Sequence, residues 1–309
     1  MSGAVGGRTL ARMSRWTTAD IPDQTGRTII VTGANSGLGK VTAAELAAKG
    51  AHVVLACRSL EKAQAAADSM RGSTEVRALD LSDLASVRAF AADLPHERID
   101  VLVNNAGVMA PAESRTPAGW ELQLATNVLG HFLLTNLLLP RVTDRVVWLA
   151  SMAHRFGRIS LSDPNWERRR YERWQAYGQT KLADLMLAYE LQRRLTAAGS
   201  LVRSVAAHPG YSATNLQDRP EQGWQRPVLQ LLNRLPFVAQ PAEQGALPVL
   251  YAATVPDLPG GIYIGPDGPF EASGYPRPVG SSAASHDREK ARGLWTLCEE
   301  LTGEPFTVR

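Results

Sequence analysis

From residue 28 onward the chain alternates short, β-branched apolar runs with longer segments rich in alanine and leucine. Most of the apolar runs lack polar alternation, which is typical of strands buried on both faces of a parallel sheet. Strand–helix–strand repetition at this spacing predicts βαβ units with right-handed crossovers. The predicted strands are Thr28–Thr32, His52–Ala56, Glu75–Leu79, Ile99–Val103, Arg145–Ala150, Val202–Ala206 and Ile262–Ile264.

Helices are predicted between these strands, for example Leu38–Lys49, Leu60–Met70 and Leu84–Leu94. Gly50 would end the first of them and Ser59 would cap the second. No repeat, low-complexity block or linker divides the chain, so residues 25–309 are predicted to form a single doubly wound α/β (Rossmann) domain with a mostly parallel seven-stranded sheet and helices on both faces. Residues 1–24 are expected to be an N-terminal tail that is disordered in part.

Composition excludes several other classes of protein. Hydrophobic residues make up 44% and charged residues 20% of the 309 positions, which excludes wholesale disorder. The net charge of +3 is too small to predict a nucleic-acid partner, and the cluster Arg168–Arg170, interleaved with acidic residues, indicates a solvated helix face. Cys57 and Cys298 have no CxxC spacing, which excludes a disulfide scaffold and a structural zinc site and fits the cytoplasm. No apolar run is long enough to span a membrane.

The first predicted strand leads into a glycine-rich turn that opens the first helix. Glycines allow positive φ and a close approach of backbone N–H groups to a pyrophosphate, and the helix N-terminus adds partial positive charge. A tight β–α turn alone would need the same residues, but this position favours a dinucleotide site. The expected contacts are Gly33, Asn35, Ser36, Gly37, Leu38 and Gly39.

The ends of the next strands carry further candidate cofactor contacts. Arg58 follows the second strand, at the position where an acidic residue would bind a ribose 2′-hydroxyl. An arginine there can bind a 2′-phosphate instead, which favours NADP(H) over NAD(H). The alternative is that Arg58 is simply a surface residue. Asp80 and Leu81 follow the third strand, where a carboxylate can meet the adenine edge; Asp80, Ser82 or Asp83 could equally cap a helix. Asn105, Ala106 and Gly107 follow the fourth strand, as a groove floor or as a turn.

Tyr177 and Lys181 are four residues apart, which places both side chains on one face of a helix. A free phenol has a pKa near 10, and lowering it to about 7 takes about 4 kcal/mol. A fixed ammonium about 4 Å away supplies about that much at an effective dielectric constant near 20. Such a pair can act as a general acid/base for an alcohol or carbonyl. The same spacing also occurs by chance on solvated helices.

Three other polar residues lie near this predicted site. Ser151 ends the fifth strand, where its hydroxyl could hold a substrate oxygen. Asn127 lies in a mostly apolar helical segment, either as a helix-bend residue or to hold a water. His154 is the best histidine candidate for a substrate contact, although a packed structural role is the commoner one. The Pro- and Trp-punctuated region at about 211–241 follows a late strand and is predicted to be a lid.

Several motifs resemble, in their order along the chain, those of the short-chain dehydrogenase/reductase family. They are TGANSGLG, NNAG, Asn127, Ser151, YGQTK and Pro209–Gly210. The resemblance covers about residues 25–265. Two further stretches look like the retinol dehydrogenase and protochlorophyllide reductase-like branch. They are the sequence GLGKVTAAELAAKGAHVVLACR and the sequence SMAH, which is followed by a long gap to Tyr177.

This resemblance implies a catalytic tetrad and further cofactor contacts. Tyr177 would exchange the proton, and Ser151 would orient the substrate oxygen. Lys181 would also bond the nicotinamide ribose, and both Tyr177 and Lys181 are expected to contact the cofactor. Asn127 would hold a water in a proton relay. Thr214, shortly after Pro209 and Gly210, matches the residue that anchors the nicotinamide amide. Thr180 stands where many relatives have Ser, a mild departure.

The resulting expectation is an NADP(H)-dependent oxidoreductase that transfers a hydride between nicotinamide and a small apolar alcohol or carbonyl, with no metal and as a possible homodimer. A catalytically idle NADP(H)-binding sensor or scaffold is the alternative from another class, against which the complete tetrad argues. A nucleotide-sugar epimerase would usually have another glycine spacing and a larger C-terminal domain.

Overall fold

The computed structural model describes residues 15–211 and 240–307. One eight-stranded sheet runs through it in the order β3-β2-β1-β4-β5-β6-β7-β8. All neighbouring pairs are parallel except β7 and β8. The strands are β1 Thr28–Thr32, β2 His52–Cys57, β3 Ser73–Ala78, β4 Ile99–Asn104, β5 Val142–Leu149, β6 Arg203–Ala207, β7 Tyr263–Pro266 and β8 Pro276–Pro278.

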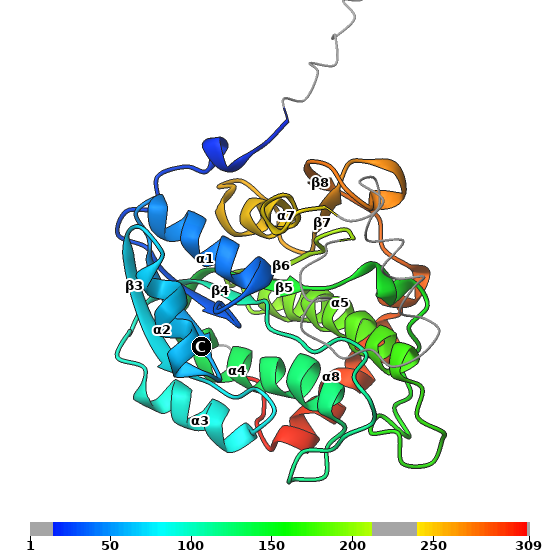
Figure 1. Ribbon diagram of the computed structural model, residues 1–309. Coiled ribbons are helices and arrows are strands. Elements are labelled where there is room, and N and C mark those ends of the chain that lie inside the picture. The colour runs from blue at the N-terminus through cyan, green and yellow to red at the C-terminus, as the bar shows by residue number, and fades with distance from the viewer. Residues whose placement is uncertain (1–14, 212–239, 308–309) are drawn as a thin grey trace, which may run out of the picture.

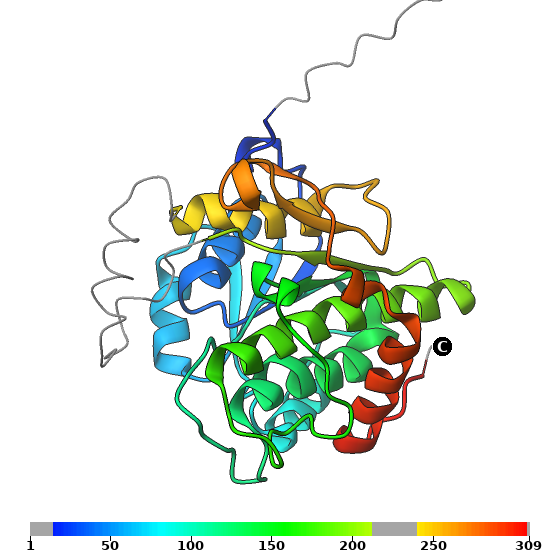
Figure 2. The same cartoon turned by 90° about the vertical axis from the view of Figure 1, so that its right-hand side faces the viewer.

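Helices cover both faces of this sheet (Figure 1). One buried cluster joins the sheet to α1 Gly37–Ala48, α2 Leu60–Asp68 and α7 Ala242–Thr254. The cluster on the opposite face joins it to α3 Leu84–Asp93, α4 Gly130–Leu138, α5 Arg173–Ala197 and α8 Arg288–Thr302. The view in Figure 2, turned by 90°, also shows these two helical layers. The doubly wound α/β architecture predicted from the sequence is therefore confirmed.

The expected count of seven strands is wrong by one. The additional strand, β8, is three residues long, begins and ends with proline, and pairs antiparallel with β7 at the edge of the sheet. Proline cannot donate to a strand ladder and is confined to edges, so a Pro-Arg-Pro sequence carries no strand signal. The third strand begins two residues earlier than predicted, because the half-exposed edge strand β3 lacks the apolar run of a buried strand. The fifth strand begins three residues earlier than predicted, at Val142, because Thr143 and Asp144 interrupt its apolar pattern.

Helix ends follow the predicted capping chemistry. The Ser59 side chain accepts a hydrogen bond from the Lys62 backbone at the start of α2, and Gly50 takes a φ of 98° just after α1. Asp83, one of the alternatives considered above, is the residue that caps α3, through the backbone N–H of Ala85. Side-chain oxygens thus satisfy free N–H groups at these helix starts.

Two segments outside the βαβ units pack against the domain. Trp16 meets Tyr251 of α7 edge-on with ring centroids 5.2 Å apart, so the folded part of the structure begins before residue 25. The sequence predicted that the Arg168–Arg170 cluster lies on a helix face. The cluster instead lies in the loop before α5. There the Arg169 guanidinium stacks on Trp166 at 3.6 Å from the ring centroid. This contact holds the Arg169 side chain within the loop.

Candidate active site

The glycine-rich loop between β1 and α1 leaves its helix N-terminus open. Gly33 and Gly37 take φ values of 66° and 54°, which favour glycine. A Cβ on Gly39 would lie 2.5 Å from the Gly33 carbonyl oxygen, so the loop and the helix touch there. The N-cap residue, Ser36, makes no side-chain cap hydrogen bond, whereas side chains cap α2, α3, α5 and α8. Within the part of the chain that the structure describes, the Ser36 side chain thus leaves the N–H groups in the first turn of α1 uncapped, and a pyrophosphate could accept hydrogen bonds from them.

Thr32, the last residue of β1, ties this loop to the end of β4. Its hydroxyl oxygen accepts hydrogen bonds from the backbone N–H groups of Asn105 and Ala106, both at 2.9 Å. The Asn105 side-chain amide in turn donates to the Thr32 carbonyl at 2.7 Å. Gly107 follows, and a Cβ on it would lie 3.3 Å from Asn127 Oδ1 and 3.7 Å from Lys181 Nζ. The structure thus brings the predicted groove floor beside two of the predicted catalytic residues.

The predicted cofactor contacts at the carboxyl ends of β2 and β3 differ in how many hydrogen bonds their side chains already make within the protein. Arg58 is exposed, and within residues 15–211 and 240–307 its side chain has no hydrogen bond or ion pair. Asp80 Oδ1 accepts hydrogen bonds from the Ser82 backbone and hydroxyl at 2.9 and 2.6 Å, which closes a turn. Leu81 is buried, and its carbonyl approaches Gly130 at the start of α4. Arg58 is therefore available to a ligand, while one Asp80 oxygen serves the loop.

Asn127 lies in a π-helical turn, Leu124–Leu129, directly before α4. Its side chain is fully buried and holds the loop after β4 from both sides: Oδ1 accepts from the Val108 N–H at 2.8 Å, and Nδ2 donates to the Val108 carbonyl at 3.0 Å. Nδ2 also donates to the Thr180 hydroxyl at 3.0 Å, and that hydroxyl donates to the Tyr177 carbonyl at 2.8 Å. Asn127 therefore links the groove floor to the turn that carries Tyr177. π-Turns within helices are frequent at functional sites.

Tyr177 and Lys181 stand one turn apart on α5, and the Lys181 ammonium lies 5.9 Å from the centroid of the Tyr177 ring. The ammonium donates to the Leu149 carbonyl at 2.8 Å and to the Asp184 carboxylate at 2.9 Å. An ammonium has three N–H donors, so one is left for a ligand. Among the described residues none bonds to the Tyr177 hydroxyl.

The ion pair between Lys181 and Asp184 is buried, with side chains 5% and 4% exposed. Burial lowers the pKa of Lys181, but the Asp184 carboxylate outweighs it and the net pKa is raised. Burial also raises the pKa of the Asp184 carboxyl to about 6, although Lys181 opposes this. Loss of hydration disfavours the charged form of each group and the partner's charge favours it. At neutral pH both remain charged, and the ammonium is fixed in place.

Ser151 follows β5 and begins a short 3₁₀ helix, Met152–Arg155. Its hydroxyl oxygen accepts a hydrogen bond from the Ala153 N–H at 3.2 Å, so the hydroxyl proton remains free to donate. His154 is fully buried and contacts the Ser151 carbonyl through Nδ1 at 2.7 Å, while its Nε2 accepts from the Ser282 backbone at 3.1 Å. Burial lowers the pKa of His154 to about 4. This histidine is thus a neutral support behind Ser151, and both of its nitrogens are occupied.

The Pro209–Gly210 segment follows β6. Gly210 has a φ of 69°, and a Cβ there would lie 2.4 Å from the Ala272 carbonyl oxygen. Its backbone N–H donates to His208 Nδ1 at 3.2 Å. Thr214 and most of the lid predicted at about 211–241 lie outside the described residues.

Three supporting residues were missed by the sequence analysis: Thr32, Asp184 and His131. His131 Nε2 contacts the Thr32 hydroxyl at 3.0 Å, and its Nδ1 contacts the Asn127 carbonyl at 3.1 Å. Burial lowers the pKa of His131 to about 3, so it is a neutral bridge. Sequence spacing offered a signal for two of them, since His131 lies four residues after Asn127 and Asp184 three after Lys181.

With this geometry in view, comparison with known proteins identifies the family. A family model described as short chain dehydrogenase matches residues 27–223. The chain belongs to the short-chain dehydrogenase family. Its members are oxidoreductases of CH–OH and C=O groups that use NAD(P), so the expected enzyme class is confirmed. The described residues of this short-chain dehydrogenase include no helix long and apolar enough to cross a membrane.

Relatives place the enzyme in the retinol dehydrogenase-like branch, as predicted. Retinol dehydrogenase 13 of Homo sapiens is 40% identical over 298 residues, covering 90% of this chain and 85% of that protein. Retinol dehydrogenase 12 of Mus musculus is 38% identical, covering 90% of this chain and 87% of its own. Dehydrogenase/reductase SDR family member 13 of Bos taurus is 43% identical, with 90% and 74% covered.

Solved structures agree with the fold. An uncharacterized protein from Mycobacterium paratuberculosis is 50% identical with a TM-score of 0.83, covering 96% of this chain and 100% of that one. A crystal structure from Beutenbergia cavernae, described as that of an NAD(P)-dependent gluconate 5-dehydrogenase candidate with bound NADP at low occupancy, is 29% identical with a TM-score of 0.54. It covers 74% of this chain and 90% of that one.

Proposed function

We propose that this short-chain dehydrogenase uses NADP(H) to interconvert an apolar alcohol and its carbonyl, with Tyr177 as the general acid/base. The observation that carries the proposal is the Tyr177 hydroxyl, which has no partner among the described residues, one helical turn from the ammonium of Lys181. The neighbouring polar groups of Asn127 and Thr180 are engaged within the protein. A phenol left free beside a fixed cation is suited to exchange a proton with substrate.

The cofactor fits the open N-terminus of α1. The uncapped first turn would hold the pyrophosphate, and the exposed Arg58 would pair with the 2′-phosphate of NADP(H). The third N–H of Lys181 is available to the nicotinamide ribose. Thr214 is proposed, on the family resemblance alone, to anchor the nicotinamide amide. When bound, NADPH supplies the hydride.

The chain's own residues handle the substrate oxygen. The Ser151 hydroxyl donates to it, since the lone-pair side of that hydroxyl already accepts from Ala153. Tyr177 gives its proton to the oxygen as negative charge develops there, and the positive charge of Lys181 favours the phenolate left behind. Asn127 keeps the turn that carries Tyr177 in register with the groove floor; a water on its remaining lone pair is part of the proposal.

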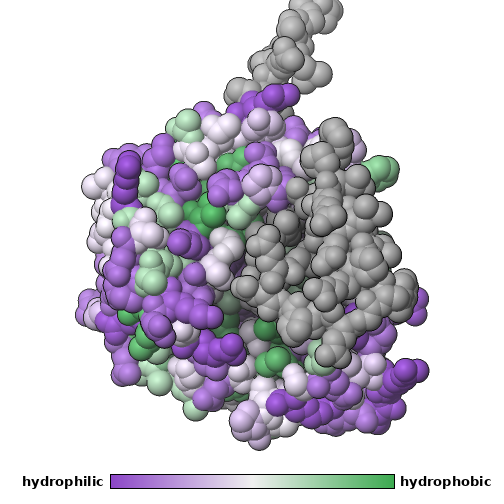
Figure 3. Space-filling model, in the orientation of Figure 1, coloured by the Kyte–Doolittle hydropathy of each residue, from purple (hydrophilic) through white to green (hydrophobic). Residues whose placement is uncertain are grey.

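An apolar substrate is supported by the relatives and by the surface. The relatives at 38–41% identity are named retinol dehydrogenases. On the face shown in Figure 3, hydrophobic residues are scattered, and some border the hollow near its centre. Retinoid, steroid, lipid and quinone carbonyls all meet this description, and a homodimer in the cytoplasm remains the expected setting.

The test is oxidation of NADPH with a panel of carbonyls. All-trans-retinal, a long-chain aldehyde, a steroid ketone and a quinone should include at least one substrate, while open-chain sugars should not react. NADPH binding without turnover of any of them would instead support the idle scaffold.

Cofactor choice is tested separately with Arg58→Asp. The change removes a charge-assisted bond and places a like charge at the phosphate, so the loss for NADPH should be about 2–4 kcal/mol. Binding of NADH should change much less. Titration calorimetry with both cofactors measures the difference, and equal weakening would show that Arg58 does not bind the 2′-phosphate.

A further inference from the structure

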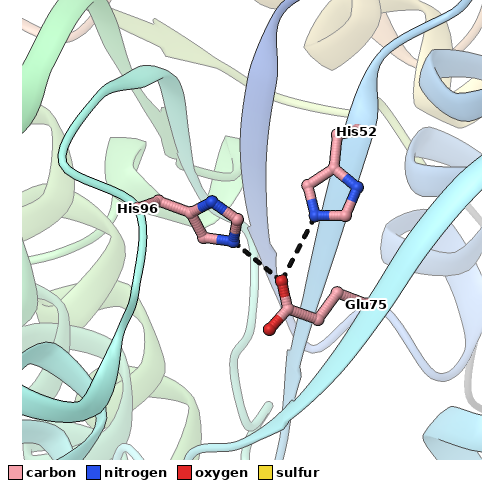
Figure 4. A group of neighbouring side chains, drawn as sticks. All are labelled: His52, Glu75 and His96. Atoms are coloured by element: carbon pink, nitrogen blue, oxygen red, sulfur yellow. Dashed lines mark hydrogen bonds and ion pairs between the residues drawn. The ribbon is translucent and has the colours of Figure 1, made fainter.

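A cluster of metal-ligating side chains lies far from the proposed active site, at the opposite end of the sheet. His52 is the first residue of β2, Glu75 lies in the middle of β3, and His96 follows α3. Figure 4 shows both imidazole rings directed at one carboxylate. Arg58, in contrast, follows the last residue of β2, so about 20 Å of strand at 3.3 Å per residue separates it from His52. An ion in this cluster would not reach the cofactor.

The donor atoms converge on one point. His52 Nε2 lies 3.2 Å and His96 Nε2 2.7 Å from the same oxygen, Glu75 Oε2. One ligand atom from each residue lies within 4.8 Å of the others. Tetrahedral bonds of about 2.0–2.2 Å place ligand atoms roughly 3.4 Å apart. An ion would therefore lengthen the His52–Glu75 distance by about 0.2 Å and the His96–Glu75 distance by about 0.7 Å.

Neighbouring groups orient the cluster in the way that the outer contacts of a metal site do. His52 Nδ1 contacts the Ser73 hydroxyl at 2.7 Å, which leaves Nε2 facing the cluster. Arg77 pairs with the other oxygen of Glu75, Oε1, and also donates to the Asp93 carbonyl at 3.1 Å. The Arg77 cation is thereby fixed on the far side of the carboxylate. Glu75 Oε2 remains directed at the two imidazoles.

The charge and the access of the cluster also suit a cation. The Glu75 carboxylate pairs with the Arg77 guanidinium through one oxygen and leaves the other for a cation. Side chains of His52, Glu75 and His96 are 32%, 24% and 21% exposed, so an ion can enter from solvent and keep a water. Without an ion, the same groups would form only a hydrogen-bonded network.

We propose that His52, Glu75 and His96 bind one divalent transition-metal ion, of which Zn²⁺ is the type, with water in the fourth position. Two imidazoles and one carboxylate match Zn²⁺, Cu²⁺, Ni²⁺ and Co²⁺ rather than the all-oxygen sites of Mg²⁺ and Ca²⁺. The cysteine count of the sequence excludes only thiolate zinc sites, and both thiols are buried. The ion would join β2, β3 and the segment after α3, and so stabilise this edge of the sheet.

The test uses the full chain after treatment with a chelator and dialysis. Titration calorimetry with ZnCl₂ should show one ion per chain with a Kd in the micromolar range. At about 100 times the Kd, Zn²⁺ should raise the thermal midpoint by about 4 °C, whereas Mg²⁺ and Ca²⁺ should not. His96→Ala, in a loop, and Glu75→Gln, which keeps the shape of the side chain, should each weaken Zn²⁺ binding at least tenfold.

His286→Ala is the matched control, because His286 is exposed and lies outside the cluster. It should bind Zn²⁺ as the wild type does, and NADPH affinity should be equal in all the proteins. The proposal is overturned if the wild type binds Zn²⁺ more weakly than about 1 mM. It is equally overturned if His96→Ala and Glu75→Gln bind Zn²⁺ with the wild-type affinity, which would place the ion elsewhere.

Discussion

Because the Asp184 carboxylate is buried, the free energy of unfolding is expected to depend on pH. Its pKa is raised from the ordinary value of 3.8 to about 6, because burial outweighs the attraction of Lys181. The folded state therefore holds this proton more tightly than the unfolded state does. The contribution of this group to stability is fully present below pH 3.8 and is lost as the pH rises through 6.

The magnitude follows from the pKa difference. Each pKa unit corresponds to about 1.36 kcal/mol, so the raised pKa of Asp184 contributes about 3 kcal/mol to the free energy of unfolding at low pH. About 2 kcal/mol of it falls between pH 4.5 and 7.5. Asp184→Asn keeps the side-chain shape and an acceptor for Lys181 but removes the titrating group. Relative to wild type, the variant should thus gain about 2 kcal/mol in free energy of unfolding across that range.

Urea unfolding of both proteins at several pH values from 4.5 to 7.5 measures this difference. Only its change with pH matters, so any constant cost of weakening the ion pair with Lys181 cancels. Asp93→Asn, at the exposed end of α3, is the matched control and should show no such trend. A difference between Asp184→Asn and wild type that stays constant within about 0.5 kcal/mol would show that the pKa of Asp184 is not raised in the folded protein.

Two further predictions concern the frame of the site. Asn127→Ala removes three side-chain hydrogen bonds and leaves the Val108 N–H without its acceptor, so urea unfolding should show a loss of about 3 kcal/mol; a loss below about 0.5 kcal/mol would contradict the linking role of Asn127. Gly39→Ala brings a Cβ to 2.5 Å from the Gly33 carbonyl oxygen, so stability should fall by about 1–3 kcal/mol and NADPH affinity with it, as calorimetry would show; unchanged affinity would place the pyrophosphate elsewhere.

Much of the fold could be predicted because its central strands are buried on both faces. The apolar runs that became β1 and β4 were placed within a residue, since short β-branched runs between helices are typical of strands buried on both faces. The prediction failed where that pattern is lost. The edge strand β3 is half exposed, β8 consists of Pro-Arg-Pro, and the central strand β5 begins at Val142, three residues before the predicted Arg145, with the polar Thr143 and Asp144 between them. The pairing of β8 with β7 depends on tertiary contacts.

The site was predictable to the extent that single residues carry its chemistry. Spacing alone put Tyr177 and Lys181 on one helix face, and the glycine turn placed the open N-terminus of α1. What the sequence could not show is which polar groups hold each other across distant segments. Thr32 meets Asn105 over 73 positions, and the hydroxyl of Thr180, read as a mild change, accepts a hydrogen bond from Asn127.

Tyr177→Phe shows directly whether Tyr177 transfers the proton, because the ring remains and only the hydroxyl is lost. The measurement is kcat for NADPH-dependent reduction of an apolar aldehyde, with NADPH affinity measured in parallel and Tyr251→Phe, whose ring packs on Trp16, as the control. General acid–base steps contribute about 10²–10⁴ in rate, so kcat should fall at least about a hundredfold while NADPH affinity stays within about twofold. A Tyr177→Phe variant that reduces the aldehyde as fast as the wild type would show that another group transfers the proton.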